Sequence, residues 1–122
     1  MKENALELAK SWSENTYFDE NDRQQLKDLL GDYDQSEEDI TESFYQDLEF
    51  GTGGMRAVIG FGSNRMNKYN IRKATQAMCN IVLKDNPTNP KACVSHDCRR
   101  FSVEFAREVA SVYAANGIKC YI

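Results

Sequence analysis

Apolar residues recur at helical spacing through the first fifty positions. Over residues 5–12 they repeat at intervals of three and four, which predicts a helix with one apolar face. A second helix is predicted over residues 19–30, and Gly31 after it is suited to a left-handed C-terminal position. Ser36 is the expected N-cap of a third helix, with acidic residues in its first turn. The residues expected to face the core from this helix are Ile40, Phe44 and Leu48.

The pattern changes after residue 50. Glycines at positions 51, 53, 54, 60 and 62 exclude a helix, so residues 55–61 are predicted to be extended or irregular. A helix over residues 69–84 and a short buried strand over residues 91–95 follow. Ser102 is then expected to cap a further helix, and a second strand begins at Ile118. Strand, helix and strand joined by short loops make a βαβ unit, in which the two strands are parallel. The inward residues expected of the helix over 69–84 are Ile71, Ala74, Thr75, Met78, Ile81 and Val82.

Composition narrows the class of protein. A length of 122 residues, 41% of them apolar, suits one ordinary globular domain. No apolar run reaches the ~18 residues that a membrane span needs, and the N-terminus lacks the apolar core of a signal peptide, so a cytoplasmic protein with no membrane partner is expected. The net charge of −4 divides unevenly, because residues 1–50 hold 15 acidic and 4 basic residues and residues 51–122 hold 4 acidic and 11 basic ones. Either solvated helix faces differ in sign, or the basic half meets an anion such as phosphate or nucleic acid.

The four cysteines lie at positions 79, 93, 98 and 120, and His96 is the only histidine. Zinc sites need thiolates or imidazoles at short spacings, and disulfide frameworks belong to exported proteins, so neither is predicted. Three cysteines lie in apolar stretches and are expected to be reduced core residues, whereas Cys98 is expected in a loop. His96 and its neighbour Ser95 point to opposite faces of a strand and form no nucleophile and base pair. Neither a metal site nor a catalytic set is therefore predicted in this chain.

Phosphate binding is one interpretation of the glycine-rich segment at residues 50–56. Thr52 offers a hydroxyl donor, and Gly53 and Gly54 let backbone N–H groups converge on an anion. Arg56 can bind phosphate through two parallel hydrogen bonds. The segment is neither a Walker A loop nor a dinucleotide-binding Gly-x-Gly-x-x-Gly. By itself it is either a phosphate cradle or an ordinary glycine-rich turn.

A second candidate follows the strand predicted over residues 91–95. Ligands of open α/β sheets bind at the carboxyl ends of strands, where the next helix also offers free N–H groups. Arg99 and Arg100 can hold a phosphate there, or Asp97 can pair with Arg99 and brace the loop. A third and weaker candidate loop contains Asn64 and Arg65.

Five short motifs occur in order along the chain. They are Phe50-Gly51-Thr52-Gly53-Gly54-Met55-Arg56, Asn64-Arg65-Met66-Asn67, Ala74-Thr75-Gln76, Asp97-Cys98-Arg99 with Ser102 and Phe105-Ala106, and Ala114-Ala115-Asn116-Gly117-Ile118. Together they resemble the start of the α-D-phosphohexomutases, which are the phosphoglucomutases and phosphomannomutases. The resemblance is strong from Phe50 onward. Before Phe50 it consists only in the predicted helices.

The resemblance implies an α/β fold, with a mixed sheet layered between helices over residues 50–122 and an N-terminal helical arm over residues 1–49. It implies an isomerase of carbohydrate metabolism, an intramolecular phosphotransferase that interconverts hexose 1-phosphate and hexose 6-phosphate of glucose or mannose. The family works through a phosphoserine and a hexose 1,6-bisphosphate intermediate, with Mg²⁺ as cofactor. The implied phosphate-binding residues are Thr52, Gly53, Gly54, Arg56 and Arg99, with Asn64, Arg65 and Arg100 as further candidates, and Asp97 and Ser102 are implied to be structural.

The family's serine motif, Thr-Ala-Ser-His-Asn-Pro, and its Asp-x-Asp-x-Asp magnesium loop do not occur in this sequence. The chain also ends at Ile122, within the pattern of a strand, so it is expected to be a fragment whose partners are the remaining domains of the same polypeptide. The 122 residues alone are expected to be inactive. A free-standing phosphate or sugar-phosphate binding module is the alternative. A nucleic-acid-binding domain is disfavoured, because the basic residues are not interleaved with aromatic ones and the total charge is acidic.

Overall fold

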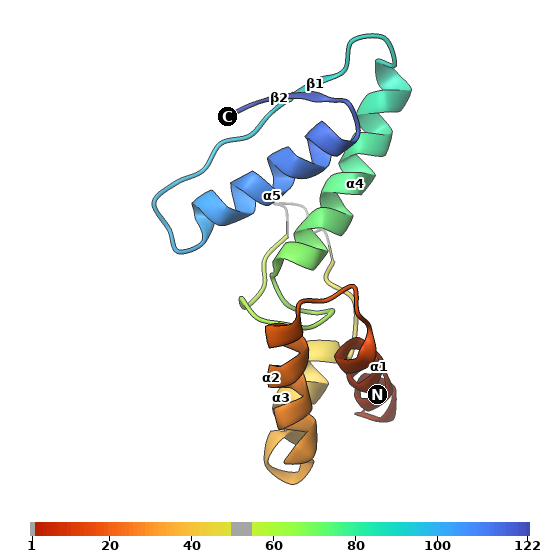
Figure 1. Ribbon diagram of the computed structural model, residues 1–122, viewed down its shortest axis with the longest axis vertical. Coiled ribbons are helices and arrows are strands. Elements are labelled where there is room, and N and C mark those ends of the chain that lie inside the picture. The colour runs from red at the N-terminus through yellow and green to blue at the C-terminus, as the bar shows by residue number, and fades with distance from the viewer. Residues whose placement is uncertain (1, 50–54) are drawn as a thin grey trace. The chain divides into compact units, whose positions relative to one another are not determined.

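The computed structural model describes residues 2–49 and 55–122 (Figure 1). Contacts between Cα atoms divide the chain into two compact units, Met1–Asn67 and Lys68–Ile122, and each is described by itself. The division of the chain into a helical arm over residues 1–49 and an α/β domain over residues 50–122 stays a prediction.

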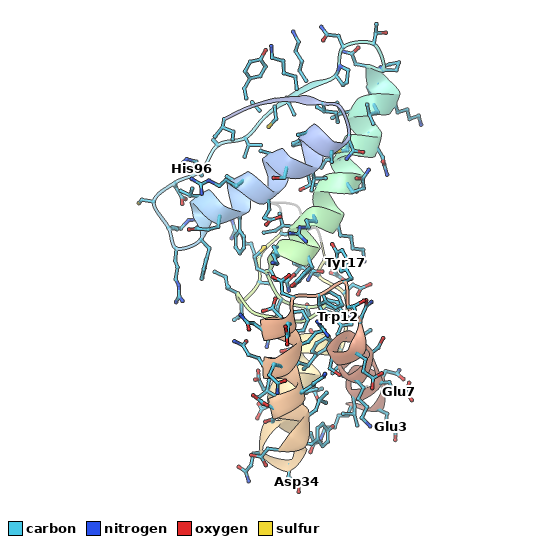
Figure 2. All side chains as sticks on the ribbon, in the orientation of Figure 1. Glu3, Glu7, Trp12, Tyr17, Asp34 and His96 are labelled. Carbon is cyan, nitrogen blue, oxygen red and sulfur yellow. The ribbon has the colours of Figure 1, made fainter. Side chains whose placement is uncertain are left out.

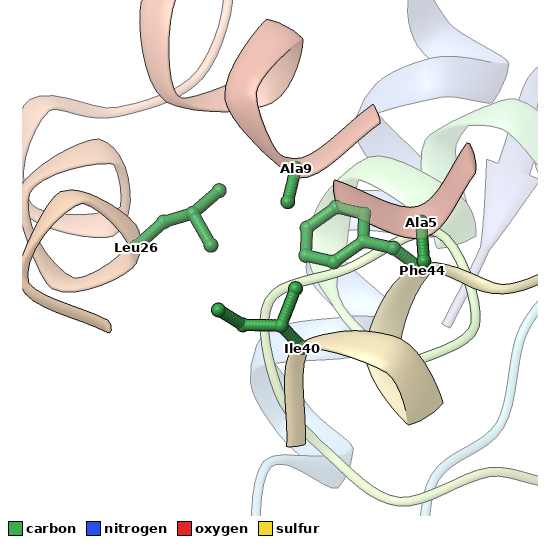
Figure 3. Packing of buried hydrophobic residues seen from close by; sticks show 5 residues of the cluster. All are labelled: Ala5, Ala9, Leu26, Ile40 and Phe44. Carbon is green, nitrogen blue, oxygen red and sulfur yellow. The ribbon is translucent and has the colours of Figure 1, made fainter. Parts of the chain in front are cut away.

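The first unit contains three helices, as predicted. They are α1 (Lys2–Glu14), α2 (Glu20–Gly31) and α3 (Tyr33–Phe44). Their apolar faces meet in one core, because residues three and four positions apart lie on the same side of a helix. Figure 3 shows the five buried residues of this core, which are Ala5, Ala9, Leu26, Ile40 and Phe44.

Aromatic rings extend this core to the segment after the helices. Trp12, labelled in Figure 2, stacks on Phe18 with a centroid separation of 4.3 Å. Its ring also contacts Phe44 at 5.3 Å and Phe61 at 5.1 Å. Aromatic pairs at such distances contribute about 0.5–1.5 kcal/mol beyond the area that they bury. Residues near Phe61 are thereby fixed to the three helices.

Two helix boundaries in this unit differ from the prediction. Only Asp32 separates α2 from α3, and it is the C-cap of one helix and the N-cap of the other. Gly31 is therefore the last helical residue of α2 instead of a left-handed residue, and Ser36 is a buried residue within α3 instead of its N-cap. Leu48 lies beyond the end of α3 and is half-buried. The predictions for Gly31 and Ser36 were wrong because the two helices follow one another without room for separate caps.

The second unit is a βαβ unit preceded by a long helix. Its elements are α4 (Lys68–Asp85), β1 (Lys91–Cys93), α5 (Ser102–Ala115) and β2 (Lys119–Tyr121). The two strands are parallel, as predicted, and pair Ala92 with Cys120 in register. Gly117 has a φ of 73° and ends α5, as expected. The resulting fold is helix-rich with a small parallel sheet, while the mixed sheet stays a prediction.

Helix α4 buries part of the face that the sequence pattern predicted, because Ile71 and Thr75 are buried and Val82 packs against the core of the second unit. Its buried residues are Tyr69, Ile71, Thr75 and Cys79. Met78 and Ile81, which were expected inside, are 43% and 56% exposed. Polar pairs also join α4 to α5, since Arg72 contacts Glu108 through two hydrogen bonds of 2.8 and 3.3 Å. The side chains of Gln76 and Asn116 form a reciprocal amide pair at 3.0 and 2.9 Å.

The four cysteines differ in their burial. All four are free, and Cys79 of α4 is fully buried against Tyr113 and Ile118, where burial raises the pKa of its thiol. Cys120 is half-buried and Cys98 is exposed in a loop. Cys93 is exposed, so the prediction of a core residue was wrong. Strand β1 is shorter than expected, and successive residues of a strand alternate between faces, so only Ala92 of β1 faces inward and Cys93 points away from the core. No helix in the described part of the chain has the length and apolarity to cross a membrane.

Candidate phosphate-binding site

Arg56 is the first candidate anion-binding residue that the structure describes. Its side chain is exposed, and it forms no hydrogen bond or ion pair with any residue among 2–49 and 55–122. Since no described residue uses its five N–H donors, the guanidinium can offer them to an added anion. Thr52, Gly53 and Gly54, the other candidates in this motif, lie outside the described residues.

Asn64 and Arg65 lie against the C-terminus of α3. The amide nitrogen of Asn64 donates to the carbonyl of Ser43 at 2.9 Å, and its side-chain amide donates to the carbonyl of Glu42 at 3.1 Å. The last carbonyls of a helix have no partner within the helix, so these donors cap α3 from outside.

Arg65 adds positive charge at the same helix end. Its guanidinium is 14% exposed and lies 3.7 Å from a carboxylate oxygen of Glu42 and 4.0 Å from one of Asp39. A cation near the C-terminus of a helix is favourable because of the helix dipole. The geometry therefore favours a structural role for Arg65, in contrast to the exposed Arg56.

The second group of candidates forms a braced turn between β1 and α5. The carboxylate of Asp97 accepts hydrogen bonds from the backbone N–H of Arg99 at 2.9 Å and from its Nε at 2.7 Å. The N–H of Asp97 donates to the hydroxyl oxygen of Ser102 at 3.0 Å. Helix α5 begins at Ser102, so Ser102 is its first residue and not its N-cap. The N-cap is Phe101, which has a left-handed φ of 65°. The predicted cap was wrong because the hydroxyl of Ser102 bonds back to Asp97.

Arg99 and Arg100 differ in their availability to an anion. The guanidinium of Arg99 is already paired with Asp97, although both side chains are exposed. Arg100 lies over the ring of Phe101, 4.8 Å from its centroid, and has no carboxylate partner in the described part of the chain. Arg100 is thus the better placed of the two for a phosphate, whereas the sequence favoured Arg99.

The charge of Asp97 is stabilised by its partners. The N–H of Arg99 is the main cause that lowers the pKa of the Asp97 carboxyl, and the Arg99 side chain adds to it. A lowered pKa means that the stabilisation is present above the unfolded value of about 3.9 and is lost as the pH falls through the folded value.

We expect the Arg99 amide resonance to titrate with a midpoint below about 3.9 when followed by two-dimensional NMR. In Arg99→Ala the midpoint should rise but stay lowered, because the backbone donor remains. A midpoint at or above about 3.9 in the unmodified chain would contradict the braced turn.

A catalytic centre is not assembled by the described residues. His96, labelled in Figure 2, is exposed in the loop after β1, and its Nδ1 lies 3.3 Å from the carbonyl oxygen of Asp97. Within residues 2–49 and 55–122 no three side chains of the metal-binding types are grouped to hold a metal ion. The chemistry that the described candidates offer is anion binding, by the exposed guanidinium groups of Arg56 and Arg100.

Comparison with known proteins places the chain in a family. Residues 47–122 match the family described as phosphoglucomutase/phosphomannomutase, alpha/beta/alpha domain I. A phosphoglucomutase of Staphylococcus epidermidis (strain RP62A) is 31% identical over 108 residues, which are 88% of this chain and 19% of that protein. A phosphoglucomutase of Staphylococcus aureus (strain MRSA252) is 35% identical over 72% of this chain and 16% of its own length.

A third relative is a phosphoglucomutase of Staphylococcus haemolyticus (strain JCSC1435), 36% identical over 66% of this chain and 15% of that protein. The chain thus spans less than a fifth of the length of these relatives. No solved structure matches it significantly. The family match covers more than half of the chain and includes Arg56 and the braced turn at Asp97, and the chain therefore belongs to the phosphoglucomutase/phosphomannomutase family, as part of its domain I.

Proposed function

We propose that the complete protein to which these residues belong is a phosphohexomutase that interconverts hexose 1-phosphate and hexose 6-phosphate of glucose or mannose. In this proposal a phosphoserine donates its phosphoryl group to the substrate and recovers it from a hexose 1,6-bisphosphate intermediate. The observation that carries the proposal is an exposed arginine, Arg56, without a partner among the described residues, within a matched domain of this family.

The role proposed for Arg56 is electrostatic. Negative charge is spread over the oxygens of a phosphoryl group during transfer, and a preorganised guanidinium stabilises it. Thr52, Gly53 and Gly54 are proposed to supply further donors beside it. Two parallel hydrogen bonds from one arginine also orient the phosphate, which lowers the entropy cost of reaching the reactive geometry.

The turn between β1 and α5 is proposed as a second phosphate-binding candidate, within the second unit. Asp97 and Ser102 hold the backbone through the contacts of 2.9 and 3.0 Å, which suits the structural role expected of them. Arg99 and Arg100 are proposed as the residues that can contact phosphate, with Arg100 the more available.

Other parts of the reaction are assigned outside this chain. The proposal places the phosphoserine downstream of residue 122, after the next strand of the same α/β domain. The magnesium ligands are placed elsewhere in the complete protein, where Mg²⁺ would neutralise phosphate charge. The described residues offer no ligand cluster for it, so no step here depends on the ion. The remainder of a mixed, layered sheet is likewise proposed to come from residues beyond the two short strands.

The experiment that tests this function measures isomerisation by the purified complete gene product. We expect glucose 1-phosphate or mannose 1-phosphate to be converted to the 6-phosphate, with stimulation by the hexose 1,6-bisphosphate. The 122-residue chain, checked for folding by circular dichroism, should show no turnover. Absence of turnover of both sugars by the complete protein would refute the function, and turnover by the 122 residues would refute their inactivity.

A further inference from the structure

Backbone hydrogen bonds to one loop hold the chain before and after Arg56. The N–H of Leu48, upstream of Arg56, donates to the carbonyl of Ser63 at 2.8 Å. Downstream, the carbonyl of Val58 accepts a hydrogen bond of 2.8 Å from the N–H of Met66. Residues 58–67, called here the 58–67 loop, therefore hold the two flanks of the segment that carries Arg56.

The side chain of Asn67 holds the 58–67 loop together. Its half-buried Nδ2 donates to the carbonyls of Gly60 at 2.9 Å, Gly62 at 3.0 Å and Arg65 at 3.4 Å. The N–H of Gly60 adds a backbone bond of 3.0 Å to the carbonyl of Met66. One side-chain amide thus satisfies several carbonyls that an irregular loop leaves without a ladder partner.

The 58–67 loop is in turn fixed to the C-terminal end of α3. The buried hydroxyl of Ser63 donates to the carbonyl of Gln46 at 2.8 Å, and Asn64 donates to the carbonyls of Ser43 and Glu42. Helix α3 carries the core residues Ile40 and Phe44. The flanks of Arg56 are therefore connected by short hydrogen bonds to the most buried part of the first unit.

We propose that Asn67 and Ser63 are positioning residues for Arg56. Asn67 acts by holding the 58–67 loop in the conformation in which the N–H of Met66 binds the carbonyl of Val58. Ser63 acts by anchoring the same loop to Gln46 and by accepting the hydrogen bond of Leu48. This inference rests on the phosphate-binding role proposed above for Arg56. Arg56 lies only two residues before Val58, so its Cα is within about 7 Å of a fixed point. A misplacement of a catalytic group by about 1 Å can cost on the order of 100-fold in rate, so the clamp has a kinetic consequence.

Asn67→Asp in the complete gene product tests the clamp. The substitution keeps the shape of the side chain, but a carboxylate cannot donate to the three carbonyls and is repelled by them. We expect kcat for the hexose phosphate to fall about 10- to 100-fold. Asn21→Asp is the matched control, because Asn21 is exposed on α2, and it should leave kcat unchanged.

A double-mutant cycle separates positioning from general damage. If Asn67 acts through Arg56, Asn67→Asp should change the rate by less than about 3-fold in the Arg56→Ala background, because the group that it positions is already gone. Losses that multiply in the double variant would overturn the proposal. A wild-type rate in Arg56→Ala would instead refute the role of Arg56 and, with it, the functional meaning of the clamp.

A second readout does not depend on enzymatic activity. Trypsin cuts after arginine where the backbone can leave its fixed conformation, so cleavage after Arg56 should be at least about 10-fold faster in Asn67→Asp than in the wild type or Asn21→Asp. Cleavage after Arg107 in α5 is the internal reference and should not change.

Ser63→Ala is a milder variant, which covers the case in which Asn67→Asp fails to fold. It removes only the hydroxyl that anchors the loop to Gln46, so the acceleration of cleavage after Arg56 should be smaller. Unchanged cleavage after Arg56 in the folded variants would overturn the proposal, even where the mutase function holds.

Discussion

Arg56→Ala is expected to lower kcat/KM of the complete protein for hexose 1-phosphate by about 10²- to 10³-fold, the usual cost of removing one preorganised donor to a developing charge. The thermal unfolding temperature should not change, because the Arg56 side chain is exposed and makes no hydrogen bond or ion pair with the described residues. The measurement is steady-state kinetics of the isomerisation together with a thermal melt of each variant.

Two further variants test whether the loss of kcat/KM in Arg56→Ala comes from the paired N–H donors of this arginine. Arg56→Lys keeps the charge but not the paired donors, so it should recover only part of the rate. Arg107→Ala removes an exposed arginine from α5 and should leave kcat/KM at the wild-type value. Equal kcat/KM for Arg56→Ala and wild type would show that this arginine does not contact the phosphate.

Gly62→Ala is expected to destabilise the first unit by roughly 2–4 kcal/mol, since it combines backbone strain with a steric clash. Gly62 has a φ of 154°, which side chains of other residues rarely allow. A Cβ atom there would lie 2.6 Å from the carbonyl oxygen of Ser43 and 2.9 Å from its Cβ. The variant must therefore push the 58–67 loop away from α3. Urea unfolding of the 122-residue chain, followed by the fluorescence of Trp12, measures the effect, because Trp12 is the only tryptophan and lies against Phe61.

Gly31→Ala is the matched control for this loss. Gly31 is the last residue of α2, and a Cβ atom there meets nothing within 4 Å. Alanine is a better helix former than glycine by up to about 1 kcal/mol, so this variant should be neutral or more stable. Equal stability of Gly62→Ala and wild type would contradict the close packing of the 58–67 loop on α3.

The elements of this fold were predictable where the pattern is long and periodic. The stripe on α1 and the alternation of strand, helix and strand in the second unit each bury enough apolar surface to decide the local structure. Helix caps were not predictable in the same way. Ser36 and Ser102 both have good N-cap side chains, but one is buried within α3 and the other accepts a hydrogen bond from Asp97. An N-cap side chain contributes only about 1 kcal/mol to stability, so other contacts of the same residue can outweigh it.

The candidate site was predictable only in part. The glycine-rich motif pointed to Arg56, and the Asp-x-Arg motif pointed to the turn at Asp97. The Asp-x-Arg motif allowed either a pair between Asp97 and Arg99 or a phosphate contact by Arg99. The sequence could not decide between them, because an ion pair depends on the distance between the side chains. The hydrogen bonds of the Asn67 side chain were not predicted either, although Asn67 belongs to one of the five motifs that resemble the family. Its three acceptors are backbone carbonyls, which every residue carries and no sequence pattern displays.

Periodicity, glycine positions and motif order are properties of the chain alone, and they were enough to predict the helices, the parallel βαβ unit and the family. The uneven charge can be counted directly from the residues. Only the three-dimensional structure shows that Met78 and Ile81 of α4 are exposed and that Arg72 and Gln76 pair with residues of α5 and its C-cap. It also decided that Arg65 is held at the end of α3 while Arg56 stays exposed. Both arginines have the same chemistry, and only the distances to carboxylates and carbonyls elsewhere in the fold distinguish a structural cation from one available to a phosphate.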